Sequence, residues 1–226
     1  MHEPSRTTWS GIFGVTVTPF SDDGAALDEP ALTSLVTAMV EDGIDRVVVN
    51  GHAGEYLSMS EAERRRVAEI AGRAALGRAR LYVVGVGGTP REAIDAARHA
   101  ADNGADAVMV HHPTHPFVSP AGLIGYLREI AAASPIPLVP YLKMPLGDDD
   151  VRRFADIPSV IAVKWGMNDL PAFGAAVAAT RDRAVAWICG TAELWAPFFW
   201  ALGAVGYTSG LVNVAGRPTL DLLEAL

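Results

Sequence analysis

The sequence predicts one α/β domain in which eight parallel strands close into a (β/α)8 TIM barrel. Eight short apolar runs recur at fairly even intervals, and most are apolar throughout, as in strands buried on both faces. Ala-rich segments with helical periodicity separate the runs, which is the alternation of βαβ units. The 226 residues suit one such barrel without an internal linker, so we expect a single domain over residues 1–226.

The apolar runs give the expected strands in chain order. They are Gly14–Phe20, Arg46–Gly51, Leu81–Gly87, Ala107–His112, Pro137–Lys143, Val160–Gly166, Ala184–Gly190 and Ala204–Ser209. The clearest expected helices are Ala31–Asp42, Ser60–Leu76, Pro90–Asn103 and Ser119–Ala133. Ser60 and Glu63 have the spacing of a capping box, and Gly43, Gly77 and Gly104 stand just past helix ends, where glycine is a preferred C-terminal cap.

The end of the chain leaves little room after the eighth strand. Only Arg217–Leu226 follow it, so we expect the C-terminal helical part to be short or truncated. Apolar side chains such as Leu220, Leu223 and Leu226 would then be exposed, and exposed apolar patches usually meet a partner. We therefore expect a homo-oligomer, a dimer or a tetramer.

Composition excludes several classes of function. A net charge of -8 and a pI near 5.2 argue against a nucleic-acid partner or an anionic membrane surface. The single Cys189 excludes an internal disulfide and a cysteine-built zinc site, and it fits a reducing compartment. The sequence shows neither a secretory signal pattern nor 18 uninterrupted apolar residues. We therefore expect a cytoplasmic protein without a membrane span.

Lysine is rare in this chain, with Lys143 and Lys164 standing against 16 arginines. Lys164 lies where the apolar run Val160–Gly166 gives way to a loop, and burial there would lower the pKa of its amine. A neutral amine can attack a carbonyl, whereas a guanidinium cannot. The alternative is a lysine that extends from the strand end into solvent.

Function in this fold belongs at the carboxyl ends of the strands. Those ends carry hydroxyls, imidazoles and amines, among them Thr208 at the end of the eighth strand. They carry no paired carboxylates of a glycosidase and no Gly-x-Ser-x-Gly turn. The histidines of His111–His115 suggest a metal. Because neighbouring strand residues point to opposite faces, His111 and His112 cannot easily share one ion, and we expect no metal site.

Four short motifs now resemble those of one family in order and position. They are the ending Thr18-Pro19-Phe20, the turn Gly51-His52-Ala53-Gly54-Glu55, Tyr141 with Pro145, and Val163-Lys164. From about Gly11 to Val214 the sequence resembles the dihydrodipicolinate synthase and N-acetylneuraminate lyase superfamily of Schiff-base barrels.

The resemblance implies roles for individual residues. Lys164 would form an imine with a 2-oxo acid, and Tyr141 would move protons to and from the reacting oxygen. Backbone N–H groups of the turn at His52 and Ala53 would bind the substrate carboxylate. His115 matches by position a tyrosine that some members send across a subunit interface. No metal or organic cofactor is implied.

Two features depart from the family pattern. His52 and Ala53 stand where hydroxyl-bearing residues are typical, so His52 either relays protons in their place or is a bystander. The synthase branch has an arginine shortly after the tyrosine of the fifth strand, and none follows Tyr141 here. Lys143 lies on the same side of its strand as Tyr141. It would bind a second substrate carboxylate, lower the pKa of Lys164, or lie in solvent.

The sequence favours a lyase that forms a lysine Schiff base with pyruvate or a related 2-oxo acid. The reaction would be aldol cleavage or condensation, or dehydration of a 2-oxo sugar acid. The substrate-binding residues we expect are His52, Ala53, Lys143, Thr208 and His115. The alternative is a catalytically impaired barrel that binds a ligand or a partner. A metal-dependent barrel hydrolase would need His111, His115 and a carboxylate to converge.

Overall fold

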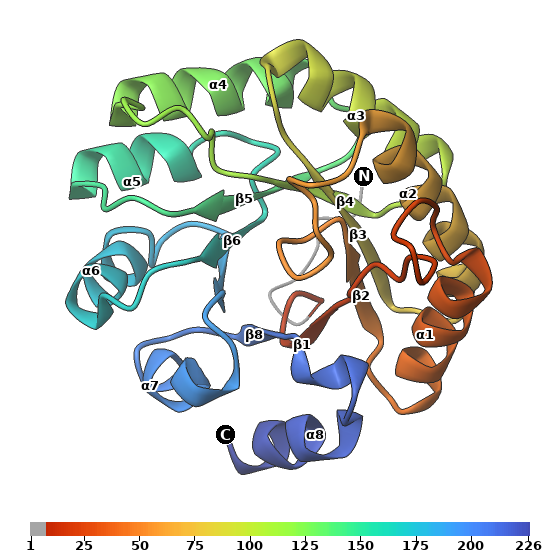
Figure 1. Ribbon diagram of the computed structural model, residues 1–226. Coiled ribbons are helices and arrows are strands. Elements are labelled where there is room, and N and C mark those ends of the chain that lie inside the picture. The colour runs from red at the N-terminus through yellow and green to blue at the C-terminus, as the bar shows by residue number, and fades with distance from the viewer. Residues whose placement is uncertain (1–7) are drawn as a thin grey trace.

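Eight parallel strands form a closed barrel in a computed structural model that describes residues 8–226, and eight helices surround it (Figure 1). The predicted (β/α)8 fold is confirmed. The strands are β1 (Gly11–Val15), β2 (Arg46–Val49), β3 (Leu81–Val86), β4 (Ala107–Val110), β5 (Leu138–Leu142), β6 (Ala162–Trp165), β7 (Ala186–Cys189) and β8 (Gly206–Ser209). The helices are α1 (Glu29–Glu41), α2 (Glu61–Ala75), α3 (Pro90–Asp102), α4 (Pro120–Ala133), α5 (Asp148–Ala155), α6 (Leu170–Ala179), α7 (Ala196–Ala201) and α8 (Gly216–Ala225). Short 3-10 helices, η1 (Glu193–Trp195) and η2 (Leu211–Asn213), precede α7 and α8.

The first strand differs from its expected position. It begins and ends earlier than the predicted Gly14–Phe20, because the chain leaves the sheet after Val15. Beyond that point Thr18 donates a hydrogen bond to the carbonyl of Gly54 at 2.7 Å. The apolar run therefore continues past the strand, and its last part holds the loop after β1 against the loop after β2.

The helix termini agree with the sequence signals. Ser60 and Glu63 form the predicted capping box at the start of α2. Gly43, Gly77 and Gly104 have φ angles of 96°, 70° and 82°, the left-handed conformation that glycine adopts readily just after a helix. These local signals fix where three of the early helices end.

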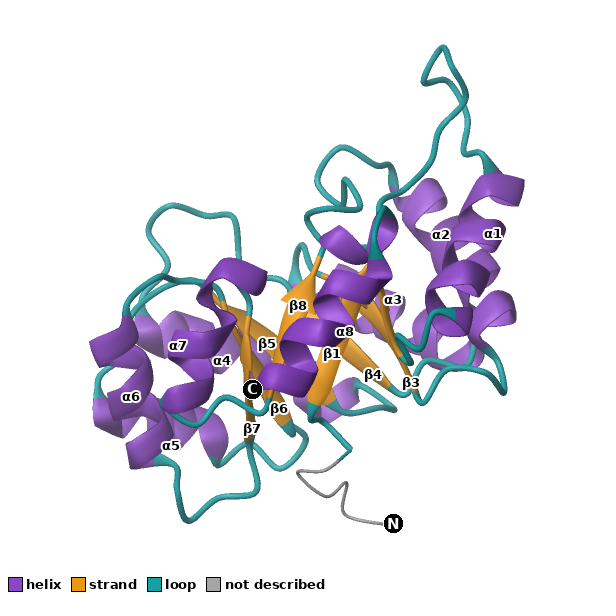
Figure 2. Cartoon of the chain, turned by 90° about the horizontal axis from the view of Figure 1, so that it is seen from below, coloured by secondary structure: helices purple, strands orange, loops and turns teal. Residues whose placement is uncertain are grey.

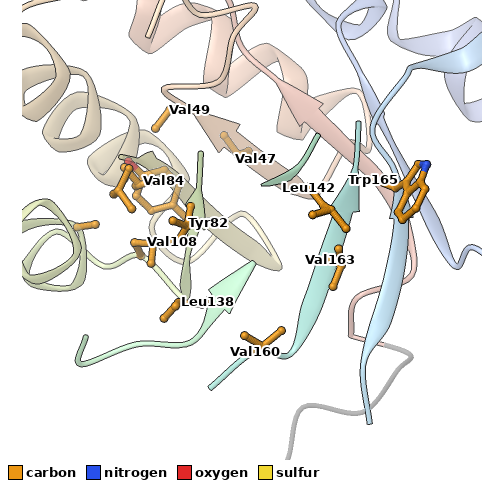
Figure 3. Close-up of a cluster of buried hydrophobic side chains, with 14 of the residues drawn as sticks. Val47, Val49, Tyr82, Val84, Val108, Leu138, Leu142, Val160, Val163 and Trp165 are labelled. Carbon is orange, nitrogen blue, oxygen red and sulfur yellow. The ribbon is translucent and has the colours of Figure 1, made fainter. Parts of the chain in front are cut away.

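The side chains of the strands form two separate apolar clusters. Phe13, Val83, Met109, Val139 and Ile188 belong to a cluster that fills the barrel interior. A larger cluster lies between the strands and the helices, and Figure 3 shows part of it, including Val47, Val84, Leu138, Val163 and Trp165. Successive strand residues therefore face the interior and the helix layer in turn, which determines which polar side chains can enter the barrel mouth.

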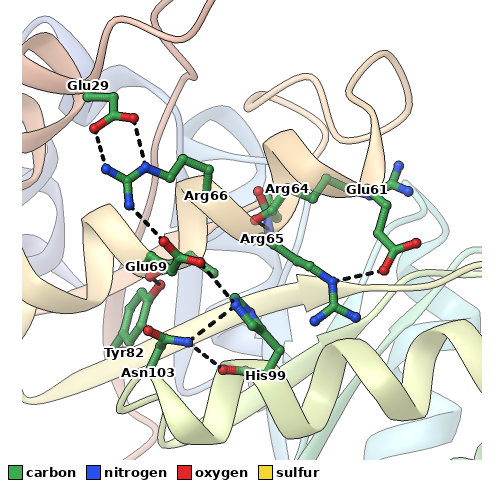
Figure 4. A network of polar contacts seen from close by, with 11 residues as sticks. Glu29, Glu61, Arg64, Arg65, Arg66, Glu69, Tyr82, His99 and Asn103 are labelled. Carbon is green, nitrogen blue, oxygen red and sulfur yellow. Dashed lines mark hydrogen bonds and ion pairs between the residues drawn. The ribbon is translucent and has the colours of Figure 1, made fainter.

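Polar side-chain contacts join the first three helices on the outside. Arg66 of α2 binds both carboxylate oxygens of Glu29 in α1, at 2.6 and 2.7 Å, and also reaches Glu69 at 2.7 Å. Glu69 lies 3.3 Å from the ring of His99 in α3 (Figure 4). These side chains are partly exposed, so their contribution to stability is modest.

The eighth helix corrects one expectation. Leu220, Leu223 and Leu226 are partly buried against the core and not fully exposed. The reason is that α8 lies beside the barrel, as Figure 2 shows, and the hydroxyl of Tyr207 in β8 donates to the carbonyl of Thr219 at 2.6 Å. The expected domain begins at residue 1, and its first seven residues lie outside the part described. Over residues 8–226, no helix has the length and apolar character needed to cross a bilayer.

One buried hydrogen bond of the outer layer yields a stability prediction. The indole of Trp187 donates to the hydroxyl of Thr180 at 3.0 Å, and both side chains are about 1% exposed. Replacing Thr180 by Val keeps the shape but removes the acceptor, so we expect the free energy of unfolding to fall by about 1–3 kcal/mol. Thr180→Ser keeps the hydroxyl and should lose less in urea unfolding. Equal losses in the two variants would contradict this role of the hydrogen bond.

Candidate active site

Two predicted catalytic residues meet at the carboxyl ends of β5 and β6. Tyr141 and Lys164 are direct partners in the register of these strands. Both have the interior-facing phase, since Val139 and Ala162, two residues earlier, belong to the interior cluster. The Nζ atom of Lys164 lies 4.2 Å from the centroid of the Tyr141 ring. The fold thus places a primary amine on an aromatic face within the barrel.

Lys164 is a buried amine without an ion-pair partner. Lys164 is 5% exposed, and none of the ion pairs within residues 8–226 involves it. Burial, and secondly the charge of Lys143, lower the pKa of Lys164 to about 7. At neutral pH a large share of this amine is therefore unprotonated and can act as a nucleophile.

Two glycines after the strands make room for this pair. A Cβ atom on Gly166 would lie 2.3 Å from Cε2 of the Tyr141 ring. A Cβ atom on Gly190 would lie 2.8 Å from Cγ of Lys164 and 2.5 Å from the carbonyl oxygen of Trp165. Side chains at these positions would displace the tyrosine ring or the lysine stem, so the absence of a Cβ atom is part of how the site is built.

Lys143 approaches the same ring. Its Nζ atom lies 4.7 Å from the Tyr141 centroid, although the stem of this lysine is exposed. Burial raises the pKa of the Tyr141 hydroxyl and lowers the pKa of Lys143. The tyrosine is therefore protonated at neutral pH and can donate a proton, and two amines share one aromatic neighbour.

His52 joins the cluster through Lys143. Its Nε2 atom lies 3.3 Å from Nζ of Lys143, and its ring packs edge-on against Tyr141 with centroids 5.3 Å apart. Burial, followed by the charges of Lys143 and Lys164, lowers the pKa of His52 to about 4. The imidazole is neutral at physiological pH, so it can accept a hydrogen bond from the Lys143 ammonium.

His111 belongs to the cluster, although it was not among the expected site residues. Its ring is 4% exposed, contacts the rings of His52 and Tyr56 at centroid distances of 4.7 and 4.1 Å, and lies 2.8 Å from the carbonyl of Asn50 through Nε2. Burial lowers the pKa of His111 to about 3. Its position follows from the alternation of side chains along a strand: Met109, two residues earlier, faces the interior, and so His111 faces the same side.

The remaining predicted residues have different outcomes. Thr208 is 7% exposed and lines the same small interior cavity as Lys164. The backbone N–H groups of His52 and Ala53 donate to no protein acceptor within residues 8–226, so the turn has donors available for an anion. His115 is exposed, and its ring contacts Phe117 and not the cluster. Its expected role across a subunit interface stays a prediction.

His111 and His115 have different neighbours. Within the described part of the chain, no group of three or more His, Cys, Asp or Glu side chains is arranged to hold a metal ion. The barrel-hydrolase interpretation needs His111, His115 and a carboxylate to converge. Within residues 8–226 the ring of His115 contacts Phe117, whereas the ring of His111 contacts His52 and Tyr56.

Comparison with known proteins shows the family of this chain. A sequence model of the Dihydrodipicolinate synthetase family matches residues 8–226. A 4-hydroxy-tetrahydrodipicolinate synthase of Methanothrix thermoacetophila is 34% identical over an alignment of 222 residues. This alignment covers 95% of this chain and 73% of the relative. An N-acetylneuraminate lyase of Rattus norvegicus is 34% identical over an alignment of 228 positions, which covers 95% of this chain and 70% of that protein.

A solved structure supports the same assignment. The crystal structure of dihydrodipicolinate synthase from Oceanobacillus iheyensis superposes with a TM-score of 0.93 at 37% sequence identity. The match covers 97% of this chain and 74% of that chain. Together with the family match, this likeness shows that the chain belongs to the dihydrodipicolinate synthetase family.

Proposed function

We propose that this protein is a lyase that binds pyruvate or a related 2-oxo acid as a Schiff base on Lys164. The observation that carries the proposal is the buried Lys164 amine, with a pKa near 7, set against the ring of Tyr141. Relatives named as a synthase of 4-hydroxy-tetrahydrodipicolinate and as a lyase of N-acetylneuraminate support a carbon–carbon or carbon–oxygen lyase reaction.

The proposed chemistry begins with the neutral amine. The lone pair of Lys164 Nζ attacks the ketone carbon of the 2-oxo acid, the nitrogen loses a proton and the ketone oxygen takes one up, which gives a neutral carbinolamine. The carbinolamine loses water when its hydroxyl is protonated, leaving a protonated imine. Tyr141, whose hydroxyl is protonated at neutral pH, is the proposed proton donor and later acceptor. The imine then draws electrons from the neighbouring carbon. Either a carbon–carbon bond forms or breaks at that carbon, or that carbon loses a proton and the hydroxyl group on the next carbon leaves as water.

The other predicted residues have binding roles in this proposal. The free N–H groups at His52 and Ala53 would hold the substrate carboxylate, and Thr208 would line the floor beside the imine. The neutral state of His52 argues against a charged imidazolium in the proton relay. We also propose the cytoplasmic location that the sequence leads us to expect.

The first test traps the imine. Borohydride with pyruvate should add one reduced pyruvyl group, located on Lys164 by peptide mass mapping. Because only the unprotonated amine reacts, trapping should rise as the pH increases through about 7 and level off above it. Lys164→Arg should abolish the adduct, since guanidinium stays charged. An adduct on Lys143, or no adduct with several 2-oxo acids, contradicts the proposal and favours a non-catalytic barrel.

The second test isolates the hydroxyl of Tyr141. Tyr141→Phe keeps the ring that packs on both amines but removes the proton donor. We expect the exchange of pyruvate methyl protons in deuterated water, followed by proton NMR, to slow by roughly 100- to 10,000-fold. The variant should unfold at the same urea concentration as the wild type. Exchange at the wild-type rate in a folded variant would show that Tyr141 only packs.

The third test concerns assembly. Large apolar side chains remain exposed on two parts of the surface, Leu57 and Phe117 near the barrel mouth and Leu194 with Phe198 at η1 and α7. Such side chains favour a partner, so we expect sedimentation equilibrium to give a multiple of the 23.9 kDa chain mass. Phe117→Asp and Leu194→Asp should show which face is buried, because only one should dissociate the oligomer. A monomer at micromolar concentration contradicts this expectation.

A further inference from the structure

Lys143 is a polar side chain of the site that the proposed Schiff-base chemistry does not use. It follows Tyr141 by two residues, and its Nζ atom lies above the same ring that Lys164 faces. One amine is enough to form an imine. The second amine therefore needs a separate explanation, and its surroundings provide one.

No carboxylate pairs with either lysine of the barrel mouth, Lys143 or Lys164, within residues 8–226. Of the three acidic residues that begin α5, Asp149 pairs with Arg152 and Asp150 with Arg153, and Asp148 is exposed and is in none of the ion pairs within residues 8–226. Two amines close to one ring repel each other when both are charged, and an anion between them and the solvent would relieve that repulsion.

His52 fixes the position of the second amine. The neutral imidazole accepts one of the three N–H donors of the Lys143 ammonium, which leaves two donors for a ligand. The ring of His52 is in turn held edge-on between Tyr141 and His111. A long flexible lysine is thus held over the mouth of the barrel by a side chain that cannot itself carry the charge at neutral pH.

The distances suit one short substrate. The two Nζ atoms lie 4.2 and 4.7 Å from the same ring centroid, so a chain of a few carbons bound at Lys164 comes within reach of Lys143. A single ammonium supported by a neutral imidazole matches the charge of one carboxylate better than that of a phosphate dianion.

We propose that Lys143, positioned by His52, binds a second carboxylate of the substrate, so that the preferred substrates are 2-oxo acids with a carboxylate on their distal end. This inference rests on the proposed function, because it takes Lys164 as the site of the imine. Lys143 is then a specificity-determining residue, and His52 is a positioning residue that acts through it.

The test compares two probes of equal carbon number. 2-Oxoglutarate carries the distal carboxylate, and 2-oxopentanoate has a methyl group in its place. Borohydride trapping on Lys164 should reach half its maximum at a concentration about tenfold lower, or less, for 2-oxoglutarate in the wild-type protein. Lys143→Met should bring the ratio of the two concentrations close to one. Lys143→Arg, which retains a cation, should keep part of the preference.

Further variants separate this role from other effects of charge. Arg98→Met on the outer face of α3 removes the same charge far from the mouth and should leave the ratio unchanged. His52→Leu should bring the half-maximal concentrations of the two probes closer together. His52→Gln, which can still accept a hydrogen bond from Lys143, should restore part of the difference. If Lys143 only lowers the pKa of Lys164, Lys143→Met will move the pH dependence of trapping upward for both probes and leave their ratio as in the wild type.

The outcomes distinguish the two levels of the argument. Trapping of pyruvate on Lys164 without any preference for 2-oxoglutarate would overturn the role of Lys143 and leave the proposed function standing. A preference that survives Lys143→Met would also overturn it. Failure of every 2-oxo acid to modify Lys164 would overturn the proposed function itself.

Discussion

The structure of the site depends on one constraint, an amine buried without a counter-charge. An unpaired ammonium at Lys164 is unfavourable in the dry interior of the barrel, so the amine is held near neutrality and is reactive. The interior apolar cluster keeps water away from the stem of Lys164, and strand register sets Tyr141 beside it. Two glycines leave space for both side chains. The fold supplies a reactive amine through burial, with no acidic residue to activate it.

Much of this arrangement could be predicted from the sequence because barrels follow a simple periodicity. Apolar runs and helix caps located most elements. The resemblance to the family selected Tyr141 and Lys164, and alternation along a strand put Lys143 on the same side as Tyr141. The same rule applied to β4 would have selected His111 over His112, since Met109 faces inward. The limit of β1 was missed for a physical reason: the run continues to Phe20, but the chain leaves the sheet after Val15, and Thr18 then holds the loop after β2 through a hydrogen bond.

Other features depend on contacts between distant parts of the chain. His52 and Lys143 are 91 residues apart, and their contact requires both the turn after β2 and the end of β5 to be in place. The sequence left open whether Lys143 was in solvent and whether His52 relayed protons. A side-chain pair of this kind follows from rotamers that neighbouring rings select, here Tyr141 and His111, and no local pattern records that choice.

The two amines can have different roles because a bound carboxylate raises the pKa of each amine that it approaches. The carboxylate next to the ketone of a 2-oxo acid must come close to Lys164, and in the proposed function the N–H groups of His52 and Ala53 bind it. The distal carboxylate would be held by Lys143, the more exposed of the two amines, away from the nucleophile. The ring of Tyr141 lies next to both amines and separates these roles. His52, uncharged at neutral pH, adds a hydrogen-bond partner for Lys143 without adding a further cation near the imine. A site built this way can recognise a doubly anionic substrate and still keep its nucleophile unprotonated.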